Sequence, residues 1–447
     1  MQIGIKSLGC PKNLVDSEVI CGILKEDGYK ISTQINDSDI VIINTCSFIK
    51  DAVVESIEEI ISAVKLKKEG LIKHLIVVGC LPQRYADNNL NQELPEVDAF
   101  IGVGDLLNIN RILKDILQGK QIYQVNQKPD YLYNFNTPRT ILTPQHYAYI
   151  KISDGCKNNC SYCLIPKIRG NYRSRRIDDI IKEIKILSEK QNLAEVILIG
   201  QDTTLYGVDI YGDYKLAELL QKISLLELKN LKWIRLLYTH PLHYNDKLIE
   251  VIANYPKICP YLDLPLQHIN DKILKKMNRL IEREKIISLI AKLRNKIPNL
   301  TLRTTLMVGF PGETDKDFEE LLNFVKEIRF EKLGAFIFSR EEGTPAYNFS
   351  QQIPKRIKKE RLEKIMLNQQ QVSRLINRSC IGKEMEILID KVSVDESKFA
   401  FGRTQFDAPE IDGNVILNTV KVRIGELVKV NIVDASEYDL IGEIKKI

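Results

Sequence analysis

The sequence predicts an α/β protein in three parts: an N-terminal parallel α/β domain, a central partial (β/α)6 barrel and a small C-terminal β-barrel. A chain of 447 residues exceeds what one hydrophobic core usually organises. Short β-branched runs alternate with helical periods over most of its length, which is typical of parallel sheets with crossover helices. From residue 381 onward, alternating apolar positions are punctuated by glycine instead, and this pattern is typical of a small barrel.

Strand-and-helix units open the chain. We expect strands at 3–8, 40–44 and 75–78, each followed at once by a turn that contains a cysteine. These units define an N-terminal domain that we place at 1–118. Prolines and polar residues without periodicity occupy 119–146, and this composition predicts a linker.

A longer series of strands and helices follows, and it predicts a core domain at 147–353. Its expected strands lie at 147–152, 196–199, 233–237, 261–264, 302–308 and 333–338. Their number fits an open or partial barrel better than a closed barrel of eight units. A polar stretch with helical spacing then predicts a bridging helix within 354–380, and 381–447 forms the small β-barrel.

Composition indicates the cellular compartment of the protein and the state of its cysteines. The net charge of +5 is mild and does not by itself indicate nucleic acid binding. The N-terminus has no apolar stretch of signal-peptide length, and the longest apolar runs are strand-sized, so we expect no membrane segment and a cytoplasmic protein. In that compartment the nine cysteines are expected to be free, metal-bound or catalytic rather than disulfide-bonded.

The most specific motif is Cys156-x-x-x-Cys160-x-x-Cys163. Three closely spaced soft sulfur ligands suit an iron–sulfur cluster, but electron-carrying clusters normally have four cysteine ligands, and no fourth cysteine is near. Three ligands on a 4Fe–4S cube leave one iron open, as S-adenosylmethionine (SAM) requires for chelation. A three-cysteine zinc site completed by a distant histidine, or plain buried thiols, is the alternative.

A second set of cysteines is related by topology. Cys10, Cys46 and Cys80 each follow directly after an expected parallel strand. The carboxyl ends of such strands share one edge of the sheet, so these thiols are expected to converge on a second cluster. Independent buried cysteines are the alternative, and that is the role we assign to the cysteines without a partner pattern: Cys21, Cys259 and Cys380.

These motifs resemble those of a known family. SLGCPKNLVDSE (7–18), NTCSFI (44–49), GCLPQR (79–84), DGCKNNCSYC (154–163), DLPLQH (263–268), VGFPGET (308–314) and EGTP (342–345) are similar to segments of radical-SAM methylthiotransferases. Within that family, 7–18, HYAYIK (146–151), GAFIFS (334–339) and GRTQFDAPEIDG (402–413) resemble the RimO branch. The resemblance spans nearly the whole chain.

The resemblance implies a fold and a chemistry. The three parts become a flavodoxin-like domain, a partial radical-SAM barrel and a TRAM domain. The cluster on Cys156, Cys160 and Cys163 reduces SAM, and the resulting 5′-deoxyadenosyl radical takes a hydrogen from the substrate carbon. A second 4Fe–4S cluster on Cys10, Cys46 and Cys80 holds the sulfur that becomes the methylthio group. A low-potential donor of the flavodoxin or ferredoxin type is expected to supply electrons.

The resemblance also suggests supporting residues. Tyr162 matches a family position near the adenine of SAM, and Met307 stands where many radical-SAM proteins place an isoleucine that touches adenine. Core packing is the alternative for Tyr162, and the methionine at 307 departs from the family pattern. Gln201 and Asp202 follow the second barrel strand, at the face where barrel enzymes place their sites, and either site residues or strand-end caps fit that position. The arginines that follow the cysteine motif could bind the SAM carboxylate or form a solvated basic face: Arg169, Arg173, Arg175 and Arg176.

Two substrates compete within the family. The RimO branch modifies the β-carbon of an aspartate in small-subunit ribosomal protein twelve, whereas a sister branch modifies an adenosine in tRNA. Residues 381–447 carry nine Lys/Arg and thirteen Asp/Glu, a net charge of −4, which suits a basic ribosomal protein better than RNA. We therefore expect Asp407, Glu410 and Asp412 to dock the substrate, with ordinary loop solubility as the alternative. A non-enzymatic electron carrier or RNA-binding module fits the cysteine pattern less well.

Overall fold

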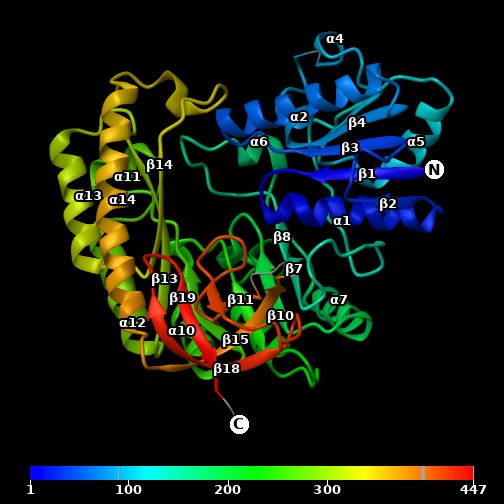
Figure 1. Ribbon diagram of the computed structural model, residues 1–447. Coiled ribbons are helices and arrows are strands. Elements are labelled where there is room, and N and C mark those ends of the chain that lie inside the picture. The colour runs from blue at the N-terminus through cyan, green and yellow to red at the C-terminus, as the bar shows by residue number, and fades with distance from the viewer. Residues whose placement is uncertain (89, 394–397, 446–447) are drawn as a thin grey trace.

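The computed structural model describes residues 1–88, 90–393 and 398–445. Its parts follow one another along the chain (Figure 1). The N-terminal domain, in blue and cyan, lies over one end of the green central barrel, and the C-terminal barrel, in orange and red, lies against the other end. No helix of the described residues is long and apolar enough to cross a membrane.

The N-terminal domain is a parallel sheet with strand order β2-β1-β3-β4-β5-β6. The order of the strands along the sheet reverses between β1 and β3, while all strands stay parallel. This strand order is that of flavodoxin-like folds, as expected. Helices α1 and α5 bury apolar residues against one face, and α2 covers the other. The bounds are β1 (Gln2–Ser7), α1 (Pro11–Glu26), β2 (Lys30–Ser32), β3 (Ile40–Thr45), α2 (Lys50–Lys68), β4 (His74–Gly79), α3 (Cys80–Arg84), α4 (Leu90–Glu93), β5 (Ala99–Ile101), η1 (Leu106–Asn108), α5 (Ile109–Leu117) and β6 (Ile122–Gln124).

The segment expected to be a linker is anchored to both domains. Its first residues form β6, which extends the N-terminal sheet. The rest lacks helices and strands, yet Tyr131 and Tyr133 are buried. Arg139 pairs with Glu18 of α1 at 2.5 Å and with Glu183 of the barrel at 2.6 Å. The segment therefore joins the two domains through buried ionic contacts.

The central domain is an open parallel sheet with strand order β14-β13-β12-β11-β10-β7, the partial barrel that was expected. Its helices pack around the outer face of the strands and bury the largest apolar core. The strands are β7 (Tyr147–Lys151), β10 (Glu195–Ile199), β11 (Trp233–Leu236), β12 (Ile258–Asp263), β13 (Thr301–Val308) and β14 (Lys332–Ile337). The longer helices are α7 (Ile177–Lys190), α9 (Leu216–Ser224), α10 (Asp246–Asn254), α12 (Arg283–Lys296) and α13 (Asp315–Ile328).

Short elements occupy the loops at the carboxyl ends of the barrel strands. They are β8 (Ser153–Asp154), α6 (Ile165–Arg169), β9 (Arg173–Ser174), η2 (Thr203–Leu205), α8 (Val208–Tyr211), η3 (Pro241–His243), α11 (Asp271–Lys276) and η4 (Pro345–Asn348). The bridging helix α14 (Lys355–Arg378) then runs beside β14 toward the C-terminal barrel (Figure 1).

The C-terminal domain is a closed barrel in the order β15-β16-β17-β19-β18. Its bounds are β15 (Glu384–Val392), β16 (Ala400–Arg403), β17 (Val415–Leu417), β18 (Leu427–Ala435) and β19 (Leu440–Ile444). It meets the amino-terminal ends of the central strands through buried charges. Glu195, the first residue of β10, accepts a hydrogen bond from Arg235 Nε at 2.7 Å and forms an ion pair with Arg403 of β16.

Candidate iron–sulfur sites

Cys10, Cys46 and Cys80 follow neighbouring strands of the N-terminal sheet, at the ends of β1, β3 and β4. The strand ends are in register, since Ser7 pairs with Asn44 and Thr45 pairs with Gly79. The turns also touch one another: a Cβ on Gly9 would stand 2.9 Å from Cys46 Sγ. The structure therefore brings these three cysteines to one edge of the sheet, at the point where the strand order reverses.

Asn13 holds the three turns together. Its side-chain amide donates to Leu8 O at 3.1 Å and to Thr45 O at 2.9 Å, so it spans the first two strand ends. Its Oδ1 lies 3.6 Å from Cys80 Sγ, on the third. Asn13 is fully buried, and its role in the site was not anticipated from the sequence. The one sequence feature that indicates such a role is its position: Asn13 lies in the first helical turn after Cys10, which follows a strand.

Arg169 of α6 reaches into this edge from the central domain. It is buried and pairs with Asp16 of α1 at 2.6 Å. Its Nη2 also bonds Asn13 and lies 3.6 Å from Cys80 Sγ. Leu164 and Ile168, beside it, pack with Cys80 in one apolar cluster. The thiols of the N-terminal domain therefore face the cysteine loop of the barrel.

The environment separates the pKa values of these thiols. Burial alone would raise the pKa of Cys10, but the Lys12 and Arg169 cations and nearby backbone amides bring it below its ordinary value. Burial raises the pKa of Cys80 to about 12, despite Arg169. Because the thiolate is the form that binds a metal, loading this site releases protons.

Cys156, Cys160 and Cys163 lie in the loop between β8 and α6. The loop starts at Gly155, which has a φ of +77° and where a Cβ would stand 2.1 Å from Asn171 O, so only glycine fits. Cys163 N donates to Cys160 O at 3.1 Å, which closes the loop on itself. Burial raises the pKa of Cys156 to about 12 and also raises that of Cys163.

The donor set of each triad suits an iron–sulfur cluster. A lone zinc ion binds its sulfurs at about 2.3 Å, so their mutual distances stay short. Among the described residues, no three cysteines offer sulfurs that all lie within 4.8 Å of one another. Three sulfur donors that are not all this close together are compatible with a group that presents several iron atoms.

A buried ionic bridge connects the two cysteine loops. Lys151, at the end of β7, pairs with Asp16 at 2.5 Å and with Asp154 at 2.9 Å. Asp154 stands two residues before Cys156, and Gln201 Nε2 donates to its other oxygen at 2.8 Å. Gln201 and Asp16 thus both position the start of the cysteine loop.

Tyr162 and Met307 lie in the same apolar cluster, at the carboxyl ends of the barrel strands. Met307 is buried, whereas Tyr162 is partly exposed and lies edge-on to Phe310, with ring centroids 6.5 Å apart. Arg279 donates to the Tyr162 hydroxyl at 3.3 Å. The two residues expected near SAM are therefore neighbours, next to the cysteine loop.

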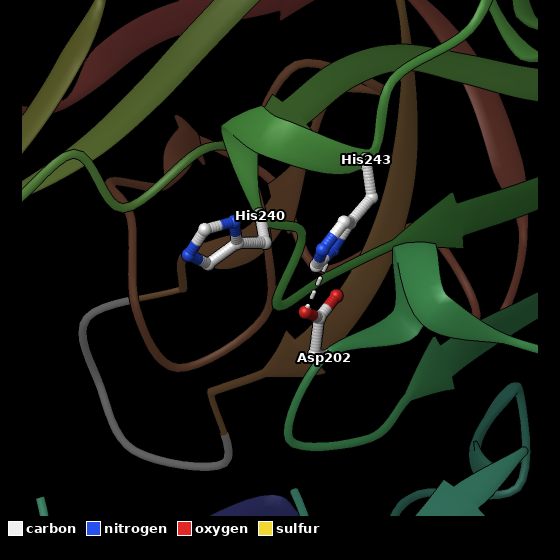
Figure 2. A group of neighbouring side chains, drawn as sticks. All are labelled: Asp202, His240 and His243. Carbon is white, nitrogen blue, oxygen red and sulfur yellow. Dashed lines mark ion pairs between the residues drawn. The ribbon is translucent and has the colours of Figure 1, made fainter. Parts of the chain in front are cut away.

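Asp202, His240 and His243 form a buried polar group beside the same loop (Figure 2). Asp202 follows β10 and the histidines follow β11. His243 Nδ1 lies 3.0 Å from Asp202 Oδ2, and the two imidazole rings stack with their centroids 5.0 Å apart. His240 Nδ1 accepts from Leu242 N at 3.3 Å. One ligand atom of each side chain lies within 4.8 Å of the others, and the three side chains form a polar anchor beside the loop.

The anchor acts on Asn158 of the cysteine loop. Asn158 Nδ2 donates to Asp202 Oδ2 at 2.7 Å, and Asn158 in turn hydrogen-bonds Cys156. Burial lowers the pKa of His240 well below its ordinary value, so the neutral ring adds no charge here. Asp202 is therefore a positioning residue for the loop.

We expect Asp202→Ala to weaken iron retention by Cys156, Cys160 and Cys163 by roughly 10- to 100-fold, as outer-shell changes at metal sites do. The reason is that Asn158 loses its partner and no longer fixes Cys156. Loss of cluster absorbance during a chelator challenge measures the effect. Asp213→Ala, at a carboxylate that is 66% exposed, is the matched control. Equal loss rates in both variants would contradict the assignment.

The four arginines near the loop have different surroundings. Arg169 and Arg175 are buried in ion pairs, Arg175 with Glu183 at 2.5 Å. Arg173 donates to backbone carbonyls, and Arg176 is exposed. Of the four arginines, therefore, Arg176 alone is a solvated surface residue.

The expected docking residues require a correction. Asp407 is buried and pairs with Lys332 at 2.6 Å, and Asp412 accepts from the Tyr261 hydroxyl at 2.7 Å. These two carboxylates fasten the C-terminal domain to β14 and β12, so they are not free to dock a substrate. Glu410 remains exposed. The sequence could not reveal partners so distant along the chain.

Comparison with known proteins agrees with this geometry. Family models described as Radical SAM superfamily, Uncharacterized protein family UPF0004 and TRAM domain match residues 150–325, 2–102 and 381–444. Proteins named ribosomal protein uS12 methylthiotransferase RimO, from Clostridioides difficile (strain 630) and Caldicellulosiruptor saccharolyticus, are 46% and 48% identical to this chain. The alignments cover 99% of this chain in both cases, and 99% and 100% of those proteins.

Solved structures share the fold. The radical SAM methyltransferase TsrM from Kitasatospora setae aligns with a TM-score of 0.55 at 15% identity, over 77% of this chain and 76% of that one. The cobalamin-dependent radical enzyme OxsB aligns with a TM-score of 0.50 at 13% identity, over 82% of this chain and 56% of that one. At these identities only the fold is shared. The full-length relatives decide the family: the chain is a radical-SAM enzyme and belongs to the RimO methylthiotransferase family.

Proposed function

We propose that this enzyme replaces a hydrogen on the β-carbon of an aspartate in small-subunit ribosomal protein uS12 with a methylthio group. The observation that carries the proposal is the pairing of two three-cysteine sites on facing edges of adjoining domains, joined by the contact of Arg169 with Asp16. The names of the full-length relatives support the choice of uS12 as substrate.

The chemistry explains why two cysteine sites are needed. A hydrogen on an aliphatic β-carbon has no acidity that a histidine or glutamate base could use. When bound, a 4Fe–4S cluster with an open iron would supply the electron that cleaves SAM to a hydrogen-abstracting radical, and a second such cluster would supply sulfur, with a second SAM as the methyl donor. In the proposal Cys156, Cys160 and Cys163 hold the first group, and Cys10, Cys46 and Cys80 hold the second.

In the proposal, residues of the protein bind SAM and hold the cysteine loop in place. Tyr162 and Met307 provide an apolar contact for the adenine of SAM, and Asp202 fixes the cysteine loop through Asn158. A flavodoxin- or ferredoxin-type donor supplies low-potential electrons. Because the substrate is made and assembled in the cytoplasm, we place the enzyme there as well.

Methylthiolation of an adenosine in tRNA is the competing function within the wider family. The net charge of −4 over residues 381–447 argues against it, because a domain that grips RNA needs a basic face. Exposed Glu410 is available for a basic protein partner.

Mass spectrometry of uS12 and of tRNA from cells that lack this chain tests the substrate. We expect uS12 to lose the mass of one methylthio group and tRNA to be unchanged. The opposite result would assign the enzyme to tRNA.

Replacement of each cysteine triad by alanine tests the two sites separately. The reconstituted wild type should hold about eight irons, and each triple variant about four. The Cys10/Cys46/Cys80 variant should still cleave SAM without transferring sulfur, whereas the Cys156/Cys160/Cys163 variant should not cleave it. About four irons in the wild type would overturn the two-cluster proposal.

A further inference from the structure

Lys12 is a buried cation at the junction of the two domains. It is only 8% exposed, and its Nζ lies 3.1 Å from the centroid of the Tyr238 ring. Tyr238 follows β11, at the end of the barrel that carries the cysteine loop. The side chain therefore extends from the turn after Cys10 across to the mouth of the barrel.

Among the described residues, Lys12 forms no ion pair with a carboxylate and no side-chain hydrogen bond, and the anionic group that acts on it most strongly is the thiolate of Cys10. The other lysines and arginines buried to this extent all have ion pairs or hydrogen bonds; they are Arg84, Lys151, Arg169, Arg175, Arg235, Arg279, Lys358, Arg361 and Arg403. The carboxylates that act on Lys12 electrostatically belong to other cations, since Asp154 pairs with Lys151 and Asp263 with Arg303. A buried ammonium without a carboxylate partner is costly, so such a site gains by binding a carboxylate.

The location of Lys12 in its helix points the same way. It is the second residue of α1, and no acidic residue stands in the first turn of that helix. The N-terminus of a helix favours negative charge, so a lysine there opposes the helix dipole and adds to a positive potential. Arg169 lies near the same turn, through its contact with Asn13. Stability alone does not explain a cation in this place.

The geometry also limits which anion fits. The ammonium lies between the thiols of the N-terminal domain and the barrel mouth where SAM is proposed to bind. The ring of Tyr238 covers one side of the ammonium, and only 8% of Lys12 is exposed, so little of the side chain is open to an incoming anion. The β-carbon of an aspartate carries its carboxylate directly, so a cation that holds the carboxylate also holds the reacting carbon.

We propose that Lys12 binds the side-chain carboxylate of the substrate aspartate and thereby selects aspartate over uncharged residues. The inference rests on the proposed function and adds the residue that reads the substrate. The competing role, neutralising a charged group on Cys10, requires no discrimination between substrates.

Binding of peptides to the full-length enzyme, reconstituted without air and left unreduced, tests the proposal. The probes are labelled peptides of uS12 with aspartate, asparagine or alanine at the target position, in the presence of SAM. The wild type should bind the aspartate peptide roughly 10- to 100-fold more tightly than the asparagine peptide, as expected for a hydrogen bond between charged groups. Lys12→Met should bind both peptides equally, and Lys12→Arg should keep part of the preference.

Two controls keep the result interpretable. Lys25→Met, at an exposed lysine at the other end of α1, should behave like the wild type. The Lys12→Met variant should hold about eight irons per chain, as the wild type does. If it holds fewer, the binding test is repeated with Lys12→Gln, whose side chain ends in a polar amide. A Lys12 variant that loses iron but keeps the preference for aspartate would overturn the proposal in favour of the neutralising role.

The outcomes also separate this inference from the proposed function. If the wild type prefers the aspartate peptide and Lys12→Met retains that preference, the inference fails and the function stands. If the wild type binds none of the peptides, the proposed function fails and the inference fails with it.

Discussion

Replacing Arg169 by methionine is expected to destabilise the protein by about 3 kcal/mol and to weaken iron retention by Cys10, Cys46 and Cys80. Arg169 is 3% exposed and joins Asp16 of α1 to the barrel at 2.6 Å. Its loss leaves Asn13 and Cys80 without their cationic neighbour. This loss of stability is at the low end of the range for a broken buried ion pair, because Lys151 still pairs with Asp16 at 2.5 Å.

Denaturant titration of the iron-free protein measures the stability, and cluster loss to a chelator measures the site. Arg176→Ala is the control, since this exposed arginine should change stability by no more than about 0.5 kcal/mol. Arg169→Lys should recover part of the stability but not the simultaneous contacts with Asp16 and Asn13, which need a forked guanidinium. Indistinguishable unfolding of the Arg169→Met and Arg176→Ala proteins would show that the contact between the domains is weak.

The parts of the fold that the sequence predicts are those with strong periodicity. The buried strands that the sequence predicts have continuous β-branched runs, and α14 has helical spacing over its whole length, so their positions are confirmed to within a few residues. The prediction lacks three strands of the N-terminal sheet, β2, β5 and β6, each of only three residues. A segment of three residues is too short to show a period, even where it is fully buried as in β5.

The sequence predicts which cysteines form the site, because strand topology places them, but it does not predict the residues around them. Strand-end cysteines identify an edge, because parallel strands end together. The network around them joins residues far apart in sequence, such as Asp16 with Arg169, and no local pattern encodes such a pair. Asp407 and Asp412 failed as docking residues for the same reason. Lys12 stands in a polar stretch that a sequence suggests is exposed, and only the docking of the two domains buries it.

Glu195→Ala should be the most destabilising single change at the other end of the barrel, with a loss of roughly 3–5 kcal/mol. Glu195 is fully buried between the guanidiniums of Arg235 and Arg403. Among the described residues, its removal leaves Arg403 with Asp390, which lies 3.0 Å from its Nε and is also bonded to His146 at 2.7 Å. Arg235 keeps its hydrogen bond to Gln405 O at 2.8 Å and has no carboxylate partner left among these residues. Because the pair joins β10 to the TRAM domain, the domain should also be cut free more readily in limited proteolysis.

The comparison that identifies the cause is a combined variant. Replacing Glu195, Arg235 and Arg403 together by leucine and methionines removes the three fully buried charges. Asp390 remains, but it is 21% exposed and keeps its contact with His146. Buried ion clusters replaced by apolar side chains of similar volume are often neutral or more stable, so the triple variant should recover most of the loss. Glu250→Ala, at an exposed residue of α10, should change little. If the triple variant were as unstable as Glu195→Ala, lost packing rather than uncompensated charge would be the cause.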